Sequence, residues 1–499
     1  MSKSLRIVLL LFCVVAAPSL GYAQPMPERL DMGWLLSQPK YRNIHHDSFC
    51  RADNDNEIGN NALPGRPNVL AYKTMSVGDV RVGIKDNYVT NFQKTSGDGR
   101  CIKFVEVGRN DFHVTAVRAD KKGTDVKAAF FINDINHFYY VALSEKNYEV
   151  FRFINGKQKR VGRGKRGGKR LELLVEDNKA KVVVDGKTQK TVKLKGWACK
   201  KQLCGLFFDH SSVSCADDFI VDYRDHFEEA GIDEAVERGD VRKPNFGSYC
   251  AEEGACTASN KYTNGSKRSY RFELMQPTQE MVNKDRNNAL HSTIMLNCKK
   301  EGGYKPLDSF ILSVDVLFPE DDDELWQLDE LFAETFIQVH HAGYNIPFSP
   351  SLSININKGR IYLSTIWLEP IAKGPSPFNN DLNYRAENIM RLNNDMEEQH
   401  LKHTGYGNYS GLPYIRGKWH NITIYAKLGY NKNQAPRTVI YLDNKLILDW
   451  DTPNAYNCQE YGEFMEFGVY KWDWNTEENR KKTPIKKRVI YFDNIRFYI

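Results

Sequence analysis

The sequence predicts an all-β fold made of two successive β-sandwiches. Three observations lead to this prediction: the length of 499 residues, the 12% of aromatic residues alongside 35 glycines and 19 prolines, and the scarcity of long helical periodicities. A chain of this length is too long for one hydrophobic core. Aromatic residues between frequent turn-forming residues are typical of sandwiches and barrels.

Both halves of the chain repeat one hairpin pattern. In the first half, residues 171–186 contain two predicted strands joined at Asp177-Asn178. In the second half, residues 422–426 and 439–448 form predicted strands, with a turn at Asp443-Asn444. Each half then ends in an aromatic strand, at residues 216–223 and 491–498. Repeated hairpins of this kind predict two sandwiches of related design, of the jelly-roll type.

The first residues are typical of a secretory signal. Lys3 and Arg6 precede the apolar residues 7–17, and small residues at 21–23 favour cleavage before Gln24. This apolar run is too short to span a bilayer. We therefore expect a signal peptide over residues 1–23, and a mature chain that is secreted or periplasmic without a membrane anchor. The predicted domains are a β-sandwich over 24–238, a linker over 239–264 and a second jelly roll over 265–499.

The overall charge is small, but basic residues cluster locally. A net charge of +6 over the whole chain implies no general affinity for nucleic acid. A Gly-rich first cluster contains no acid, and a second lies near the C-terminus. The first cluster comprises Lys157, Lys159, Arg160, Arg163, Lys165, Arg166, Lys169 and Arg170, and the second comprises Arg480, Lys481, Lys482, Lys486, Lys487 and Arg488. Two interpretations fit both clusters: solvated loops, or attraction of a polyanion.

Nine cysteines remain after the predicted cleavage. They are Cys50, Cys101, Cys199, Cys204, Cys215, Cys250, Cys256, Cys298 and Cys458. In an exported protein some should form disulfides, and the neighbours Cys199/Cys204 and Cys250/Cys256 are the simplest pairs to expect. The odd count leaves at least one thiol outside such intrachain pairs. A zinc site is the weaker interpretation because the sequence has no CxxC pair.

A run of five acids at residues 320–324 could hold Ca²⁺, which prefers carboxylate oxygens. The run lacks the spacing of an EF-hand, so an exposed loop is the simpler interpretation. No other cofactor is evident from the sequence.

Polar side chains on several predicted strands alternate with apolar ones. In residues 334–341, Ile337 and Val339 should face the core, which leaves Gln338 and His340 on the open face. In residues 464–474, Phe467 and Val469 should pack inward, so Tyr470 and its alternate neighbours should share the open face. These neighbours are Glu466, Gly468 and Trp472.

The open face should therefore offer groups suited to a sugar chain. Gly468 removes a side chain next to Tyr470, and Trp472 offers a flat surface on which a sugar ring can stack. Asn355 on residues 352–357 and Arg271 on residues 269–274 should also point away from the apolar side of their strands.

These strands resemble those of a known family. Gln338-Val339-His340 resembles the Gln-hydrophobic-His strand of the sandwich-fold polysaccharide lyases, which include heparin lyase I and the alginate lyases. Residues 464–471 resemble their late aromatic-Gly-hydrophobic-Tyr strand, and the resemblance spans residues 265–499. Three further segments fit the heparin lyase I-like members, namely residues 269–274, 350–359 and 492–497.

In the first half, residues 129–142 and the following strands resemble laminin-G-like or concanavalin-like sandwiches, which commonly bind glycans. Together the resemblances imply an all-β chain with two concanavalin-like β-sandwich (jelly-roll) domains in tandem.

The resemblance to the lyases implies β-elimination at a uronic acid of an acidic polysaccharide, heparin/heparan sulfate-like or alginate-like. Gln338 would help to neutralise the sugar carboxylate, and His340 would be the base or assist it. Tyr470 would be the acid, or the base for one epimer. Five further residues would contact the substrate, namely Arg271, Asn355, Arg360, Lys471 and Trp472.

One departure from the family leaves a second interpretation open. These lyases usually carry an Arg-[Ser/Thr]-Glu-Leu strand, and the corresponding residues 291–296 here have neither that arginine nor that glutamate. Arg271 or Arg360 could take the place of the arginine. Otherwise the chain would be a non-catalytic glycan-binding protein on the same fold. A retaining glycosidase is less favoured because neither half has an E-x-D-x-x-E strand.

Overall fold

The computed structural model describes most of the chain outside its first residues and several connecting segments. The described ranges are residues 27–38, 40–47, 49, 72–92, 99–194, 202–225, 247–250, 255–296, 307–341, 350–366, 389–392, 398–400, 412–429, 432–455 and 463–499, apart from single positions within them. The predicted signal peptide over residues 1–23 lies outside the described residues.

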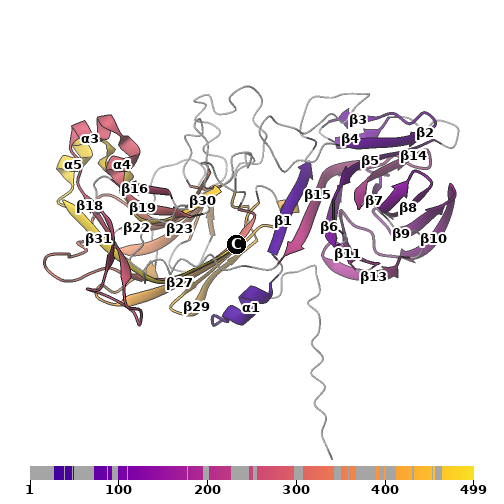
Figure 1. The fold of residues 1–499 in the computed structure, drawn as a ribbon. Coiled ribbons are helices and arrows are strands. Elements are labelled where there is room, and N and C mark those ends of the chain that lie inside the picture. The colour runs from indigo at the N-terminus through magenta and orange to yellow at the C-terminus, as the bar shows by residue number, and fades with distance from the viewer. Residues whose placement is uncertain are drawn as a thin grey trace, which may run out of the picture.

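The first half forms two antiparallel sheets, which enclose a core of aliphatic and aromatic side chains (Figure 1). The eight-stranded sheet contains, in order, β13 (Lys187–Lys193), β12 (Lys179–Val184), β11 (Arg170–Glu176), β6 (Phe112–Arg118), β15 (Cys215–Asp225), β4 (Tyr88–Asn91) and β3 (Val82–Lys85), with β1 (Lys40–Asp47) also paired to β15. The seven-stranded sheet contains β10 (Lys157–Gly164), β9 (Tyr148–Ile154), β8 (His137–Leu143), β7 (Val126–Asp134), β14 (Leu203–Asp209), β5 (Arg100–Glu106) and β2 (Lys73–Val77).

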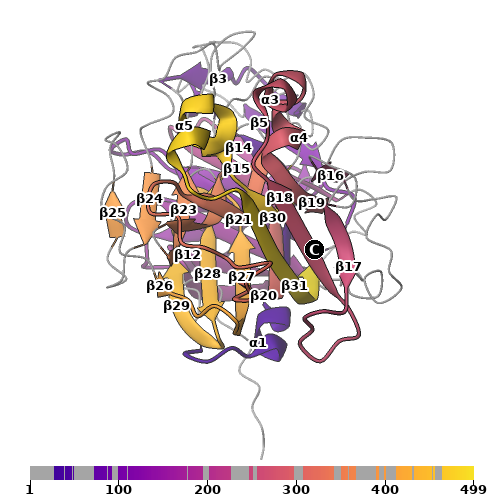
Figure 2. The same cartoon turned by 90° about the vertical axis from the view of Figure 1, so that its left-hand side faces the viewer.

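The second half also forms two antiparallel sheets (Figure 2). The nine-stranded sheet contains, in order, β16 (Gly247–Cys250), β19 (His291–Leu296), β30 (Glu463–Tyr470), β21 (Glu334–His341), β22 (Leu352–Asn357), β23 (Arg360–Ile366), β24 (Ile389–Leu392) and β25 (Glu398–His400), with β26 (Leu412–Pro413) paired to β23. The seven-stranded sheet contains β17 (Cys256–Ser259), β18 (Ser269–Met275), β31 (Lys487–Tyr498), β20 (Ser309–Leu317), β27 (Trp419–Lys427), β28 (Arg437–Leu442) and β29 (Lys445–Trp450). The predicted all-β fold of two sandwiches is confirmed.

The hairpins lie where the turn residues predict them. Strands β11 and β12 meet at the turn after Glu176, and Asn178 there has a φ of 57°. Strands β28 and β29 meet at Asp443 and Asn444, whose φ values are 49° and 64°. Two successive residues with positive φ match the right-handed twist of the flanking strands, which explains why Asp and Asn are suited to this turn.

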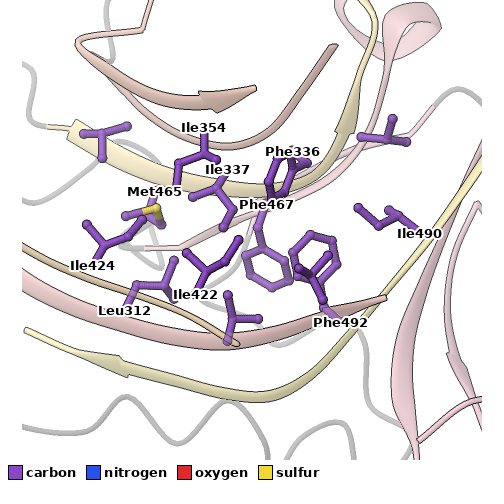
Figure 3. Close-up of a cluster of buried hydrophobic side chains, with 14 of the residues drawn as sticks. Leu312, Phe336, Ile337, Ile354, Ile422, Ile424, Met465, Phe467, Ile490 and Phe492 are labelled. Carbon is purple, nitrogen blue, oxygen red and sulfur yellow. The ribbon is translucent and has the colours of Figure 1, made fainter. Parts of the chain in front are cut away.

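The core of the second sandwich lies between its two sheets (Figure 3). Ile337 and Phe467 project from the nine-stranded sheet and meet Leu312, Ile422 and Phe492 from the seven-stranded sheet. Because this layer is apolar, the alternate side chains of β21 and β30 lie on the opposite, open face of the nine-stranded sheet.

The start of the described chain packs on the second sandwich instead of the first. Helix α1 (Met32–Ser37) buries Leu35 among side chains on the outer face of the seven-stranded sheet, including Tyr425 and Tyr441. The Tyr441 hydroxyl donates to the Pro27 carbonyl over 2.9 Å. The second sandwich therefore includes residues from the segment that the sequence analysis assigned to the first. It also includes β16 and β17, which lie within the predicted linker.

No disulfide is found among the cysteines whose side chains the structure describes. Cys199 and the side chain of Cys250 lie outside the described residues, so the pairs Cys199/Cys204 and Cys250/Cys256 stay predictions. Cys204 projects from β14 into the core of the first sandwich, while the Sγ atom of Cys256 lies 3.5 Å from the hydroxyl of Ser292. Strands β16 and β17, although close in sequence, pair with different sheets.

Polar contacts join the two sandwiches. Arg170 on β11 donates to the Asn433 carbonyl, and the Asn433 amide donates to Asp218 on β15. Arg170 also pairs with Glu172 over 3.1 Å. Arg170 is the last residue of the first basic cluster, and its side chain is therefore bound by protein groups at this junction. No helix among the described residues is both long and apolar enough to cross a membrane.

Candidate active site

The open face of the nine-stranded sheet carries the candidate site. Ile337 and Val339 are buried in the core, as the alternation predicts, and Gln338 lies on the other face opposite Glu466 of β30. Gln338 and Glu466 are each only 2% exposed, so this polar face is deeply covered at its centre.

The Glu466 carboxylate connects three strands. It accepts a hydrogen bond from the Gln338 amide nitrogen over 2.5 Å and another from the Thr293 hydroxyl of β19. The Nε2 atom of His291, also on β19, lies 3.7 Å from the same carboxylate. A buried carboxylate needs such partners because an unpaired charge in this environment is costly. Glu466 thus fixes the positions of the side chains around it.

Tyr470 and His291 lie directly opposite each other on β30 and β19. Their rings are stacked, with centroids 3.7 Å apart and planes inclined by 9°. This contact places a phenol hydroxyl and an imidazole next to each other at the end of the row of polar side chains.

The surroundings set the protonation states of this pair. Burial lowers the pKa of His291, although the Glu466 charge opposes this effect, so the imidazole is neutral at neutral pH. The Nδ1 atom lies 2.6 Å from the Asn287 carbonyl, which can only accept, so Nδ1 carries the proton and Nε2 is the unprotonated nitrogen. Burial raises the pKa of Tyr470 to about 12, which keeps its hydroxyl protonated. The pair therefore combines a proton acceptor with a proton donor.

His340 lies elsewhere on this face. It is paired with Phe464, and its ring stacks on that phenyl ring with centroids 5.4 Å apart. Tyr470 is instead paired with Thr335, five positions from His340, which is roughly 16 Å along a strand. His291 is therefore the imidazole that contacts the phenol, and the His340 charge contributes to the lowered pKa of His291.

Gly468 is required because of its backbone conformation and its close contact with the neighbouring strand, not because it leaves space for a ligand. Its φ is 137°, and a Cβ atom there would lie 2.3 Å from the Ser292 carbonyl oxygen of the neighbouring strand. The register between β21 and β30 also shifts beside it, between Thr335 and Ile337. The glycine thus permits an irregular pairing next to the site.

Three of the predicted substrate contacts lie on or beside the open face. Asn355 is buried, accepts from the Thr335 hydroxyl over 2.6 Å and donates to the Ser353 hydroxyl over 2.9 Å. Arg360 begins β23 on the open-face side of the alternation, since the next residue, Ile361, is in the core. Trp472 lies in the 3₁₀ helix η4 (Trp472–Asn475), half-buried, with its ring 5.8 Å from that of Tyr470.

Arg271 does not reach the open face. It lies on β18 of the other sheet, where its alternate neighbours Tyr270 and Phe272 fill the core. Its side chain therefore points out from the opposite side of the sandwich, and its Nε atom donates to Glu324 over 2.9 Å. Arg271 cannot replace the arginine that the sequence lacks.

Lys471 is also excluded as a contact to substrate. Its side chain is fully buried, with the Nζ atom 2.8 Å from Asp329 and 3.4 Å from Glu334. Glu334 in turn accepts two hydrogen bonds from Arg488, which is also fully buried. This network lies beneath the strand end that carries Tyr470, and it supports that end internally.

The acidic run is occupied by protein groups. Glu324 accepts from Arg271 and from the Tyr491 hydroxyl, and lies 2.9 Å from the Lys261 ammonium. In the described part of the chain, no cluster of three His, Cys, Asp or Glu side chains is arranged to hold a metal ion. The expected calcium site therefore gains no support at residues 320–324.

Sequence reasoning missed His291 and Thr293 as parts of the site, and it placed Glu466 on the open face without giving it a role. The segment 291–296 was singled out only for the arginine and glutamate that it lacks. Its alternation nevertheless puts His291 and Thr293 on one face and Ile294 in the core. Reading that pattern as a candidate site strand would have found both residues.

Arg286 was also missed, and it lies beside the site. It begins the short helix α4 (Arg286–Leu290), which leads directly into His291, and its side chain is exposed. Its positive charge acts against the rise in the pKa of Tyr470. Arg286 makes no ion pair with any residue that the structure describes.

Residues 236–496 match a family described as polysaccharide lyase. Among solved structures, the chain is similar to an endo-β-1,4-glucuronan lyase from the fungus Trichoderma reesei, at 12% identity and a TM-score of 0.37, covering 50% of this chain and 89% of that one. It is also similar to an alginate lyase from Aplysia kurodai, at 13% identity and a TM-score of 0.30, covering 49% and 86%. A third similar structure is the alginate lyase AlgAT5, at 10% identity and a TM-score of 0.29, covering 51% and 95%. No curated protein matches the chain.

The buried network around Lys471 gives a stability prediction. We expect Lys471→Met to lower the free energy of unfolding by roughly 3–5 kcal/mol, because it leaves the Asp329 and Glu334 carboxylates buried with one cation fewer. Chemical unfolding followed by fluorescence measures this loss. The matched control is Lys482→Met, which removes an exposed lysine paired with Glu478 and should change little. Equal effects of the two substitutions would contradict the structural role of Lys471.

Proposed function

The chain belongs to the polysaccharide lyase family, and we propose that it cleaves a uronic-acid-containing acidic polysaccharide by β-elimination. The matched residues include β19 and β30, which carry His291 and Tyr470. The observation that carries the proposal is the contact between a neutral imidazole and a protonated phenol on the open face of the sheet. One group can accept the proton that elimination removes, and the other can donate the proton that the leaving group needs.

The proposed reaction uses both groups at one sugar. The Nε2 atom of His291 removes the proton at C5, and the electron pair of that C–H bond forms a double bond between C4 and C5. The bond from C4 to the glycosidic oxygen breaks, and the Tyr470 hydroxyl protonates the departing oxygen. The products are a new chain end and an unsaturated uronate. The nearby Glu466 carboxylate favours the imidazolium that forms on His291.

The sugar carboxylate must be masked before C5 becomes acidic. In this proposal the Gln338 amide does so: one of its two N–H groups is held by Glu466, and the other is available to the substrate. The Gln338 carbonyl oxygen is buried and has no hydrogen-bond partner among the residues that the structure describes, which fits a side chain completed by a ligand. Arg286 supplies positive charge at the same end of the site, in the role of the arginine missing from β19.

The finer substrate class is also part of the proposal. A heparin/heparan sulfate-like polymer, as the heparin lyase I-like strands imply, and an alginate-like polymer both present the carboxylate beside C5 that the site requires. Incubation with heparan sulfate, alginate and polyglucuronate distinguishes them, because elimination produces an unsaturated uronate that absorbs in the ultraviolet. Export from the cell is proposed as well, on the basis of the apolar N-terminal residues 7–17 and the small residues that follow them.

One observation favours a second candidate, a glycan-binding protein without activity. Residues 291–296 lack the arginine and glutamate of the family strand that they resemble. Binding of an acidic glycan without any rise in ultraviolet absorbance, across the three polymers named above, would favour this candidate over the lyase.

We predict that Tyr470→Phe and His291→Ala each reduce kcat by about 10²–10⁴-fold, since each removes a group that transfers a proton. Initial rates of ultraviolet absorbance on the best polymer measure the effect, and circular dichroism checks the fold. His340→Ala is the matched control and should retain much more activity, because His340 contacts Phe464 and not Tyr470. If His340→Ala were inactive and His291→Ala active, the base would be His340.

The pH dependence of kcat/KM gives an independent test. Because His291 must be neutral to accept a proton and burial lowers its pKa, activity should appear as pH rises through a value below 6.5. The Glu466 charge raises the pKa of His291, so Glu466→Gln should move this acid limb to still lower pH, along with any loss of kcat. An acid limb that stays fixed in Glu466→Gln would mean that another group titrates.

We predict that Arg286→Ala raises KM about ten-fold for the substrate, with a smaller change in kcat, because it removes a charge that attracts the uronate. Lys284→Ala is the control: it removes an exposed charge two residues away, at the end of helix α3 (Gln279–Lys284). Equal increases in KM for both variants would mean that general charge, and not the position of Arg286, determines binding.

A further inference from the structure

We propose that the N-terminal sandwich binds the acidic polysaccharide along a basic edge surface, defined as the exposed side chains of strands β10 and β13. This inference rests on the proposed function for the class of ligand. It adds a second binding site on a sandwich that carries none of the residues of the candidate active site.

The fold brings two basic segments together that are separate in sequence. Strand β10 is the edge of the seven-stranded sheet and β13 is the edge of the eight-stranded sheet, and both lie on the right-hand side of Figure 1. At their contact, a Cβ atom on Gly162 would lie 3.5 Å from the Cδ atom of Lys190. The two edges therefore form one continuous surface, which the first basic cluster alone did not reveal.

This surface has an excess of unpaired positive charge. Its exposed basic residues are Lys157, Lys159, Arg160, Arg163, Lys187, Lys190 and Lys193, and neither strand contains an acidic residue. Arg160 pairs with Glu149 over 2.7 Å, while the other six form no ion pair with any described residue. Cations without partners on neighbouring strands attract an extended polyanion more than they stabilise the fold.

The geometry suits a linear polymer with repeated charges. Alternate residues of a strand are about 7 Å apart, so Lys157 and Lys159 present two charges in a row on one side of β10. The same strands also carry polar side chains that can bond to sugar hydroxyls, namely Gln158 on the other side of β10 and Gln189 on β13. A polysaccharide held here is also kept at high local concentration near the second sandwich of the same chain.

The second basic cluster lacks these properties. Arg480 and Arg488 are buried, and Arg488 is bound to Glu334. Lys481 and Lys482 pair with acids one turn earlier on helix α5 (Glu477–Lys482). Because three of its six charges are paired with acids and Arg480 is buried, this cluster offers a weaker site for a polyanion.

The test uses the full chain with the Tyr470→Phe substitution, so that binding is measured without cleavage. In this background, K159Q/K187Q/K190Q should bind polyglucuronate about ten-fold more weakly in affinity electrophoresis, with a weaker dependence on salt. The matched control is K73Q/K85Q/K122Q, which removes three exposed lysines from other parts of the same sandwich and should bind as the background does. Uncharged hydroxyethyl cellulose should not bind to any of the variants.

Three results would overturn the proposal. The first is equal binding of polyglucuronate by the two triple variants. The second is self-association of K159Q/K187Q/K190Q, which would mean that these lysines protect the sheet edges from pairing with other chains. The third is tighter binding of duplex DNA than of polyglucuronate.

Cleavage separates this proposal from the proposed function. With Tyr470 intact, the K159Q/K187Q/K190Q variant should cleave a short oligouronate with an unchanged kcat. Its KM should rise only for the polymer. If the wild-type chain cleaves no uronate, the proposed lyase function is wrong. The binding comparison between the two triple variants would still decide the role of the edge surface.

Discussion

The candidate site depends on one buried carboxylate. Glu466 accepts hydrogen bonds from Gln338 and Thr293 and lies close to the His291 imidazole, so it connects β21, β19 and β30. A carboxylate with 2% exposure persists only where such donors surround it. The same interaction orients the amide of Gln338 and influences the charge of His291. Positions that are distant in sequence thus form one polar network on the face of the sheet.

Burial also shifts the pKa values of His291 and Tyr470 in opposite directions. A low dielectric disfavours charge on either ring, so it lowers the pKa of His291 and raises that of Tyr470. One physical effect therefore produces a base and an acid next to each other. The fully buried ion pairs of Lys471 hold the end of the same strand, which keeps Tyr470 within contact of His291.

Much of the fold was predictable because strand alternation and turn chemistry are local. They correctly put Ile337 and Val339 inward and the turn at Asp443 and Asn444. The site was predictable only in part, because its contacts depend on register between strands. The register of β21 against β30 pairs His340 with Phe464 and Tyr470 with Thr335, and the partners that bury Lys471 come from a distant segment. The prediction that Arg271 lies on the open face was wrong for a similar reason. Which sheet its strand joins depends on the topology and not on the sequence of that strand.

The docking of residues 27–37 on the second sandwich changes how the chain must be divided. Helix α1 and Tyr441 contact each other across more than four hundred residues, so in topological terms the first sandwich is an insertion within the second. During synthesis, the earliest part of this interface must wait for the last strands to emerge. A fragment that begins after the first sandwich would leave the tyrosines under α1 open to water, and it would therefore be more prone to aggregate than the whole chain.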